Sequence, residues 1–403
     1  MKQEQLSNLP IEWKRGSGLS KSDLDNDGKN KCILYGELYT KHKTALIDHL
    51  SISRTNKIGV ICSKKGDILI PGTSTASKKD MLLAREIDED GVFLGGDINI
   101  IRPPKGLFAK KYLPYFFETL NAYDQLDRYI TGATGIIHIS NSGIKNLKVP
   151  LPSIQEQKHI VSILDEAFAA IVKAKTIAEQ NLKNAKEIFE SYLQGVFENG
   201  NWNVKKLNEI TEVKDGTHDS PKYINKGIPF VTQKNIKQSG LTFEDTKFIT
   251  EKDHEKFFKR SNVTFGDILI SMIGANRGMA AIVEDNRVFS IKNVGLIKSS
   301  KSISMDYLLY YLKSPLAMKY VLYMSNGGAQ EFVGLTALRS FPIPYPSLNV
   351  QKEIVKKLDA ISFETKKLEA ISQQKLLNLE ELKKSLLQKA FSGELNIEKG
   401  LAL

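Results

Sequence analysis

The segment VPLPSIQEQKHIVSILDEAF (Val149–Phe168) returns later in the 403-residue chain as IPYPSLNVQKEIVKKLDAIS (Ile343–Ser362), displaced by 194 residues without a gap. The same displacement pairs SYLQGVF at Ser191–Phe197 with SLLQKAF at Ser385–Phe391. A single short match could arise by chance. Ungapped agreement over about fifty residues predicts an internal duplication of the chain.

The duplication predicts the order A–B–A′–B′. The pentapeptide GDILI occurs once in each A segment, at Gly66–Ile70 and at Gly266–Ile270. Trp13 and Trp202 are expected to open the two copies. We expect a first globular domain at residues 1–149, a first long helix at 150–200, a second globular domain at 201–343, a second long helix at 344–395 and a tail at 396–403.

The two globular domains are predicted to be of the α+β class. Their short apolar runs, rich in Ile, Val and Phe, are interrupted by Gly, Pro, Asn and Ser, which is typical of strands and turns. The expected strands are Lys57–Cys62, Asp67–Ile70, Asp97–Ile101, Asp267–Ile273 and Val294–Ile297. A helix is expected near the end of each domain, at Lys111–Arg128 and at Met305–Met324.

The B segments are predicted to be long helices, because Pro is absent and Gly is nearly absent after Ser153 and Ser347. Ser153 and Glu156 have the spacing of a capping box, whereas Val350 in the second copy leaves only the serine cap. Apolar residues then step by three and four over about five heptads, which is typical of a coiled coil. Since a folded domain separates the two helices in the chain, we expect an antiparallel pair.

Asn181 and Lys375 fall at equivalent positions on the apolar seam of these helices. Polar residues on such a seam commonly determine the register of a coiled coil. Alternatively, the two side chains lie at a solvated edge of the helix pair. The sequence leaves both interpretations open.

Positive charge is concentrated in the globular segments. The chain has 57 Lys and Arg against 46 Asp and Glu, a net charge of +11, with +5 in residues 1–149 and +5 in residues 198–343. Two matched basic domains suit an extended polyanion such as duplex DNA, although a lysine excess that only aids solubility would give the same count.

The expected compartment is the reducing cytoplasm. Only Cys32 and Cys62 are present, which excludes a disulfide-stapled scaffold. We expect neither a signal peptide nor a membrane span, since no run of about 18 apolar residues occurs.

Catalytic signatures are missing from the sequence. There is no GxxxxGK[ST] loop and no HExxH pair, and the six histidines lack metal-ligand spacing. Amino-methyltransferases clamp the target amine with an Asn/Asp-Pro-Pro-aromatic loop, and the nearest string, Ile343–Pro346, departs from it. Asp67 and Asp267 could be nuclease carboxylates, but Gly-Asp before an apolar strand is a common turn. We therefore expect no catalytic site, metal or cofactor in this chain.

A set of further strings accompanies the duplicated segments, GDILI and the LPxxW-like opening. They are RGSGLSK (Arg15–Lys21), ILYGELYTKH (Ile33–His42), DGTH (Asp215–His218), GIPFVTQKNI (Gly227–Ile236) and GGAQEFVGLTALRSFPIPYP (Gly327–Pro346). In this combination and order, essentially the whole chain resembles the specificity (S) subunit of type I restriction–modification systems.

The resemblance implies two target recognition domains, each reading one half of a split duplex DNA sequence. The helices would form an antiparallel coiled coil that sets the spacing and docks two methyltransferase (M) subunits. Those partners would carry S-adenosylmethionine and methylate adenine. The resemblance also allows two ATP-driven restriction (R) subunits to join the complex. The S subunit itself would be non-catalytic.

One departure concerns the start of the first domain. In the second copy, NVKKLNEITEV follows Trp202 before the motif at Gly216, whereas Trp13 runs almost directly into Arg15–Gly18. The comparison predicts an abbreviated first domain.

Candidate DNA contacts are polar and basic residues on the expected turns. Arg, Lys, Asn and Gln can pair with base edges, and Lys, Ser, Thr and Tyr can hold phosphates. Thr217 and His218 follow from the DGTH resemblance; the alternative for any one candidate is a solvated turn residue. The candidates are Arg15, Ser17, Ser20, Lys21, Tyr35, Lys41, Thr73, Ser74, Thr75, Ser77 and Lys78 in the first domain, and Thr217, His218, Lys222, Tyr223, Gln233, Lys234, Asn235, Asn276 and Arg277 in the second.

Candidate partner contacts lie at the two helix starts. Gln157 and Lys158 repeat as Gln351 and Lys352. Two identical methyltransferase subunits related by a two-fold axis would require such a matched pair. The alternative is that these residues only complete the start of each helix.

Two other functions compete with a DNA-reading subunit. The chain could be a methyltransferase or nuclease that works alone, which the missing motifs argue against. It could also be a coiled-coil scaffold that binds only proteins, and salt-sensitive binding to duplex DNA would count against that reading.

Overall fold

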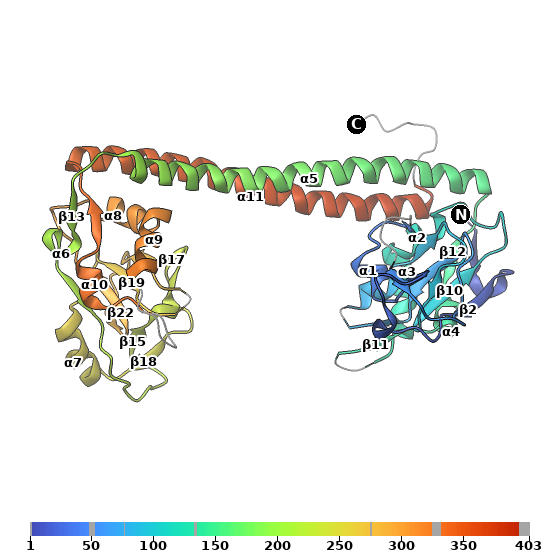
Figure 1. Ribbon diagram of the computed structural model, residues 1–403, viewed down its shortest axis with the longest axis horizontal. Coiled ribbons are helices and arrows are strands. Elements are labelled where there is room, and N and C mark those ends of the chain that lie inside the picture. Colours follow the sequence, from blue (N-terminus) through green and yellow to red (C-terminus); the bar gives the residue numbers. More distant parts are fainter. Residues whose placement is uncertain are drawn as a thin grey trace. The chain divides into compact units, whose positions relative to one another are not determined.

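The computed structural model describes residues 2–47, 53–75, 77–132, 135–274, 276–324 and 332–394. These residues form two compact units (Figure 1). Unit 1 comprises Met1–Ala178 with Gln374–Leu403, and unit 2 comprises Glu179–Gln373. Each unit therefore combines one globular domain with a part of each long helix.

Unit 1 has a five-stranded sheet and a three-stranded sheet, with most neighbours antiparallel. The first has the order β2 (Glu12–Arg15), β10 (Ile98–Arg102), β6 (Ile68–Pro71), β8 (Arg85–Ile87), β4 (Leu46–Ile47), and the second β5 (Ser53–Thr55), β3 (Asn30–Ile33), β9 (Phe93–Leu94). Two short pairs are β1 (Gln3–Gln5) with β12 (Lys148–Pro150) and β7 (Thr73–Ser74) with β11 (Ile137–His138). The helices are α1 (Glu37–Thr40), α2 (Tyr112–Phe117), α3 (Leu120–Leu126) and α4 (Asn141–Ile144).

Unit 2 repeats this plan. Its main sheet has the order β14 (Val213–Asp215), β22 (Val294–Ile297), β19 (Ile268–Ser271), β20 (Ala280–Ile282), and its second sheet β18 (Lys247–Ile249), β15 (Ile228–Val231), β21 (Ser290–Ile291). Short pairs are β13 (Val204–Lys206) with β23 (Pro342–Pro344) and β16 (Ile236–Lys237) with β17 (Gly240–Leu241). The helices are α6 (Leu207–Ile210), α7 (Glu251–Ser261), α8 (Met305–Leu312), α9 (Pro315–Met324) and α10 (Leu335–Arg339).

The expected strand at Lys57–Cys62 is wrong, and the other expected strands are confirmed to within a few residues. Only an isolated pairing of Cys62 with Phe93 falls in that segment. Ile58 is exposed and Gly59 has φ of +74°, so the stretch neither buries its apolar residue nor stays extended.

Each helix expected near the end of a domain is two helices. Thr119 caps the second helix of unit 1, where its hydroxyl accepts from Ala122 N. Ser314 does the same in unit 2 by accepting from Ala317 N, just before the helix-starting Pro315. A capping hydroxyl at this point begins a new helix in both copies.

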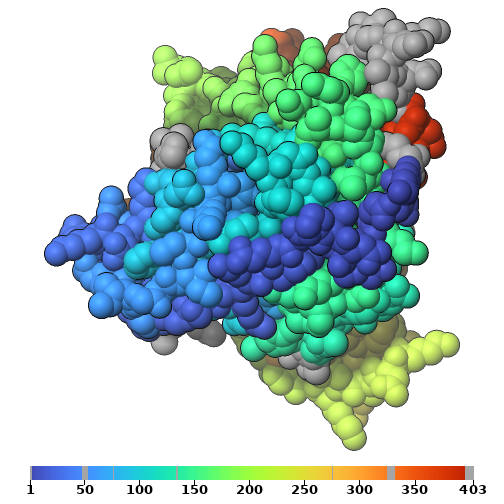
Figure 2. Space-filling view, turned by 90° about the vertical axis from the view of Figure 1, so that its right-hand side faces the viewer, coloured from blue at the N-terminus to red at the C-terminus, as the bar shows by residue number. Residues whose placement is uncertain are grey.

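The start of the first domain is complete, so the expectation of an abbreviated domain is wrong. Strand β1 and a short 3-10 turn at Leu6–Asn8 precede β2, as β13 and α6 precede β14. Trp13 lies within β2, whereas Trp202 lies before β13, so the two tryptophans are not equivalent. Figure 2 shows the N-terminal residues, in dark blue, on the surface of unit 1 beside the residues that lead into α5, where Leu151 N donates to Lys2 O.

The two long helices are continuous, with α5 at Ile154–Asn199 and α11 at Leu348–Ser392. The capping box at the start of α5 is confirmed: Ser153 N and Oγ donate to Glu156 Oε2 at 2.8 and 2.7 Å, and Glu156 N donates to Ser153 Oγ at 3.3 Å. Among the described residues the Ser347 hydroxyl has no hydrogen bond, so the serine cap does not carry over to α11.

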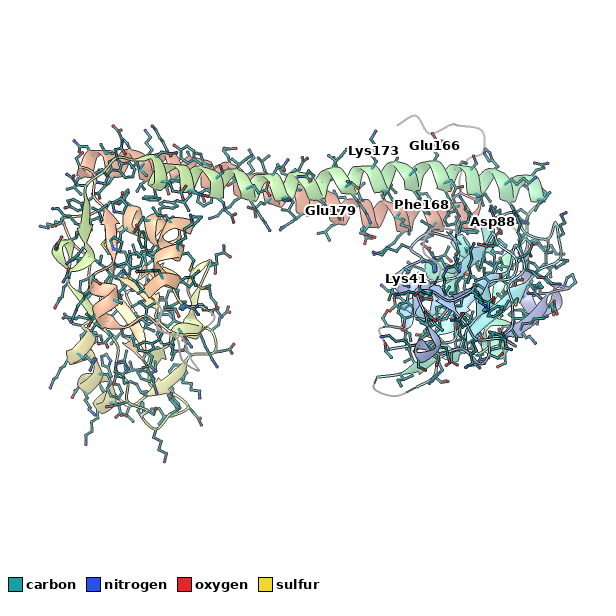
Figure 3. All side chains as sticks on the ribbon, viewed as in Figure 1. Lys41, Asp88, Glu166, Phe168, Lys173 and Glu179 are labelled. Atoms are coloured by element: carbon teal, nitrogen blue, oxygen red, sulfur yellow. The ribbon has the colours of Figure 1, made fainter. Side chains whose placement is uncertain are left out.

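The helix pairing within each unit is antiparallel. In unit 1 the ring of Phe168 contacts Lys383, and further along α5 Lys175 pairs with Glu380. Residue numbers thus rise along α5 while they fall along α11. Glu166 and Lys173 point away from the globular part of this unit, as Figure 3 shows.

The hydrophobic cores repeat with the roles of the long helices exchanged. In unit 1, Phe391 of α11 packs on Tyr112 and Phe116 of α2, with ring centroids 5.1 and 5.2 Å apart. In unit 2, Phe197 of α5 packs on Tyr307 and Tyr311 of α8, at 5.5 and 5.2 Å. Burial of each phenylalanine contributes about 1.5–3 kcal/mol. The end of α11 is thus anchored to the core of unit 1, and the end of α5 to the core of unit 2.

The seam residues Asn181 and Lys375 are both exposed. The interpretation that they determine register is therefore wrong, and the solvated edge is correct.

Substitution of Ser153 by alanine should destabilise unit 1 by about 1 kcal/mol, because the helix loses its capping hydroxyl. Ser347→Ala is the matched control and should change stability by much less. The hydrogen bonds from Ser153 lower the pKa of Glu156. Their contribution is therefore complete above about pH 4.3 and is lost as the pH falls through the folded-state pKa. Urea unfolding at pH 7 and pH 3 measures both effects; equal losses for the two serines would contradict the assignment.

Candidate nucleic-acid interface

The segments that follow β2 and β14 carry corresponding motifs, RGSG and DGTH. A Cβ on Gly16 would lie 1.9 Å from Gly95 O, and one on Gly216 would lie 2.4 Å from Ile291 O. Both glycines are required because the backbone of each segment packs directly against another backbone segment of the same unit. The RGSG and DGTH motifs therefore occupy equivalent positions relative to the main sheets of their units.

Two further segments join each motif at the same end of the main sheet. In unit 1, Ile139 N donates to Gly72 O at 3.0 Å, which joins the segment before α4 to the loop after β6. In unit 2, Val333 N donates to Met272 O at 2.8 Å in the corresponding place. Strand β11 lies at the end of unit 1 remote from α5 and α11 (Figure 1). The duplicated fold thus presents matched sets of loops.

A polar cleft of about 420 Å³ lies among these loops in unit 1. Its lining includes Arg15, Arg128, Thr131, His138, Ser140 and Ser142. Arg15 pairs with Asp97 at 2.5 Å, and Thr73 Oγ1 is 3.0 Å from His138 Nδ1. The structure thereby brings the candidates Arg15 and Thr73 together with Arg128 and His138.

Most of the other candidates in unit 1 are exposed. Ser74 and Thr75 hydrogen-bond the Tyr39 side chain, whose pKa is raised by burial. Thr73 and Ser74 are buried, so their prediction as DNA contacts is corrected: they support the loop from inside. The exposed candidates are Arg15, Ser17, Ser20, Lys21, Lys41, Thr75, Ser77 and Lys78, and Tyr35 is half-buried against the core of the smaller sheet.

Several exposed candidates of unit 1 are already hydrogen-bonded. Ser20 accepts and donates within a short 3-10 turn that includes Lys21. Lys41, labelled in Figure 3, contacts Glu37 at 2.6 Å and Ser53 at 2.8 Å. These residues lie beside the smaller sheet, not in the cleft lining, so the first-domain candidates form two groups.

In unit 2, the DGTH motif is joined to a charged network. Arg260 donates to both oxygens of Asp215 at 2.7 and 2.9 Å. His218 lies 3.1 Å from Asp215 Oδ2 and 2.7 Å from Asn293 Oδ1. The carboxylate is therefore neutralised, and the exposed imidazole of His218 is held at the surface by two partners.

Two candidates of unit 2 are internal, and their prediction as DNA contacts is corrected. Thr217 is buried, and its hydroxyl accepts from Asp219 N. Asn235 is also buried; its Oδ1 accepts from Thr232 N and its Nδ2 donates to Thr246. Both side chains satisfy backbone or hydroxyl groups of their own turns.

The remaining candidates of unit 2 surround those turns. Gln233 accepts from Ser271 at 3.4 Å, and Arg277 Nη1 donates to Gly274 O at 3.3 Å. Tyr223 stacks under the Lys247 ammonium at 4.4 Å. Asn276, Lys222 and Lys234 are exposed, and within the described part of the chain these two lysines have no acidic partner. A basic and aromatic surface of this kind suits a nucleic acid.

Sequence reasoning missed Arg128, His138, Arg260 and Asn293. Their signal was the duplication itself. Once the RGSG and DGTH motifs are aligned, the loops that pack on them can be searched in both copies for polar residues.

The prediction that Gln157 and Gln351 contact a partner is corrected. Both side chains are buried, and their Oε1 atoms accept from Ala109 N and Ser304 N at 2.9 and 2.8 Å. They join each long helix to its globular domain. Lys158 and Lys352 are exposed and stay candidates.

No group of three or more His, Cys, Asp or Glu that could hold a metal occurs among the described residues. Within the same residues, no helix is both long and apolar enough to cross a membrane.

The fold and its matched loops define a class: a duplicated protein with two α+β domains, each of which packs on parts of two long helices. The family model of the type I restriction modification DNA specificity domain matches residues 2–181 and again residues 199–378. The chain belongs to this family and contains two copies of the domain.

Curated and solved relatives agree with that assignment. The type I restriction enzyme MjaVIII specificity subunit of Methanocaldococcus jannaschii is 24% identical over 305 residues, 70% of each chain. A chain from a structural study of complex assembly in a type I R-M system has a TM-score of 0.76 at 18% identity, over 98% of each chain. The HsdS subunit from Thermoanaerobacter tengcongensis has a TM-score of 0.62 at 19% identity, over 98% of this chain and 97% of that one. These two structures have the same fold.

Proposed function

We propose that this chain is the DNA-reading subunit of a type I restriction–modification complex. Residues 1–149 and 201–343 are the two recognition modules, and each reads one half of a split duplex target. The observation that carries the proposal is the matched set of three loops, which the fold builds at the same place in both modules around Gly16 and Gly216.

The side chains on those loops favour two different half-sites. Unit 1 presents Arg15 where unit 2 has Asp215, whose carboxylate is occupied by Arg260. Unit 2 instead presents His218 beside Lys222. Because base edges are distinguished by donor and acceptor patterns, loops with different donors should select different sequences.

The long helices are proposed to set the gap between the half-sites and to dock two methyltransferase subunits. Exposed apolar side chains on α5 and α11, such as Val172, Ile188, Phe363 and Ile371, support a protein partner on the helices. The chain itself is proposed to be non-catalytic and to act in the cytoplasm, with S-adenosylmethionine and ATP bound by its methyltransferase and restriction partners. Purified alone, it should transfer no methyl group from S-adenosylmethionine to DNA.

Selection from a random duplex library by the reconstituted specificity–methyltransferase complex tests this proposal. We expect two conserved blocks separated by a fixed unconserved gap, with binding that weakens steeply between 50 and 200 mM salt, as expected for several phosphate contacts. His218→Ala should alter one block and leave the other unchanged. Absence of any enriched sequence, with the complex intact, would favour the protein-binding scaffold instead.

A further inference from the structure

The cleft of unit 1 is lined by several hydrogen-bond donors, together with Gly72, Tyr129, Ile139 and Gly143. Arg15, Arg128, Thr131, His138 and Ser140 all reach it. The Ser140 hydroxyl is 2.6 Å from that of Ser142, which also lines the cleft. Guanidinium, imidazole and hydroxyl groups of this kind are the ordinary ligands of phosphate oxygens.

The charge balance in and around the cleft leaves one arginine available. Asp97 pairs with Arg15 at 2.5 Å, and Asp127, which precedes Arg128, pairs with Lys78 at 2.6 Å. The Arg128 guanidinium lies over the ring of Tyr129, 5.0 Å from its centroid. Among the described residues it has no carboxylate partner. The nearby acids are thus neutralised and Arg128 contributes net positive charge.

Internal hydrogen bonds fix one wall of the cleft. Thr131 and His138 exchange two backbone hydrogen bonds of 2.9 and 2.7 Å, and Ile139 N donates to Gly72 O. The buried Asn99 Nδ2 donates to Ile139 O at 2.9 Å. A wall fixed in this way loses little conformational entropy when a ligand binds.

We propose that this cleft binds a phosphate group of the DNA backbone, with Arg128 as its principal charged contact. The inference rests on the proposed DNA-reading function and adds to it a sequence-independent contact at a stated place.

Among the described residues, unit 2 has different side chains at the positions of Arg128 and His138. Ala122 and Ala317 hold equivalent positions in α3 and α9, because the N–H of each donates to the capping hydroxyl of its helix. When the two helices are aligned on these alanines, Tyr323 of unit 2 falls at the position of Arg128. In the same way, the pairing of Phe332 with Ile273 matches that of His138 with Thr73. Tyr323 is 88% exposed and Phe332 is 45% exposed. Unit 2 therefore presents aromatic rings where unit 1 presents a guanidinium and an imidazole, and we expect the two modules to hold the backbone unequally.

The test measures dissociation constants of the reconstituted specificity–methyltransferase complex for its selected duplex and for an unrelated duplex, over a range of salt concentrations. Arg128→Ala should weaken binding to both duplexes by the same factor and reduce the slope of log K against log salt by about 1. The selected sequence should stay unchanged. Arg128→Lys should keep most of the slope, and Tyr323→Arg should increase it by about 1.

Lys105→Ala is the matched control, since it removes one exposed positive charge beyond the opposite end of β10 from Asp97. It should leave the slope unchanged. A wild-type slope for Arg128→Ala, or a change in the selected sequence at one position, would overturn the phosphate site while the DNA-reading function stood. A wild-type complex that shows no salt-dependent DNA binding would overturn both.

Discussion

Replacement of Asp267 by alanine should destabilise unit 2 by about 3–5 kcal/mol, the cost of breaking a buried ion pair by removing one partner. The Asp267 carboxylate is fully buried and lies 2.5 Å from the Lys298 ammonium, whose side chain is only 14% exposed. It also accepts from Ser299 N and Thr264 N, both at 2.8 Å. Without it, the Lys298 ammonium, which also donates to Asn262 O and Thr264 Oγ1, loses its carboxylate partner, and two backbone N–H groups lose their acceptor. Urea unfolding of the full chain measures the loss.

A surface ion pair provides the control for this substitution. Asp285 pairs with Arg287 at 2.7 Å, and both are partly exposed, so Asp285→Ala should leave the free energy of unfolding close to the wild-type value. The double variant Asp267→Ala with Lys298→Met should recover part of the loss, because the stranded charge is removed. A nuclease carboxylate would behave in the opposite way, with full stability and lost DNA cleavage. Equal stability of Asp267→Ala and the wild type would contradict the structural role.

Replacement of Gly216 by alanine should destabilise unit 2 by about 3 kcal/mol or more, since overpacking against fixed backbone exceeds the usual range for core side chains. The added Cβ would lie 2.4 Å from Ile291 O and 2.9 Å from Lys292 N. Neither group can move without breaking the backbone bonds that join the DGTH segment to β21 and its neighbours. We expect His218 to be displaced, so recognition of one half-site should fail as well.

A glycine-to-alanine substitution inside a helix should change the stability in the opposite direction. Gly195 lies inside α5, and a Cβ there would meet only Asn199 Nδ2, at an ordinary 3.7 Å. Gly195→Ala should therefore stabilise the protein by about 0.5–1 kcal/mol. Both variants can be compared by urea unfolding and by selection of bound DNA. A Gly216→Ala protein with wild-type stability and both half-sites intact would contradict the proposed packing of the DGTH segment.

The duplication made much of the fold predictable. The ungapped displacement of 194 residues located both long helices, and the buried GDILI strands, β6 and β19, follow from their apolar pattern. Trp13 and Trp202 led to a wrong alignment of the two domain starts. Both domains have a tryptophan near their start, but the two tryptophans do not hold equivalent positions in the fold. Their elements can be equated only through strand pairing, as in β1 with β12 and β13 with β23.

The candidate interface was less predictable for a physical reason. Thr217, Asn235 and Gln157 have the side chains expected of DNA or partner contacts, yet each is buried and hydrogen-bonded within the chain. Turns and helix starts contain backbone groups that need partners, and short polar side chains supply them. Polarity on a predicted turn therefore does not distinguish a residue that reads DNA from one that shapes the loop. Residues 327–331 of the GGAQEF string lie outside the described residues.

The two modules share a scaffold but differ in the chemistry of their loops. Arg15 in unit 1, which pairs with Asp97, corresponds in place to Asp215 in unit 2, which pairs with Arg260. An arginine offers donors to guanine, whereas a neutralised aspartate leaves the neighbouring His218 as the exposed polar group. Duplication followed by loop divergence would give one chain the two different half-sites that we propose it reads.

Adenine-methylation mapping of the host genome, with and without the gene for this chain, tests the central claim most directly. The account predicts that deletion removes methylation from one split motif, on both strands, and that restoring the gene returns it. The methyltransferase partner should be present at the same level in both strains. An unchanged pattern of methylated adenines, with that partner expressed, would contradict the account and favour a protein-binding scaffold.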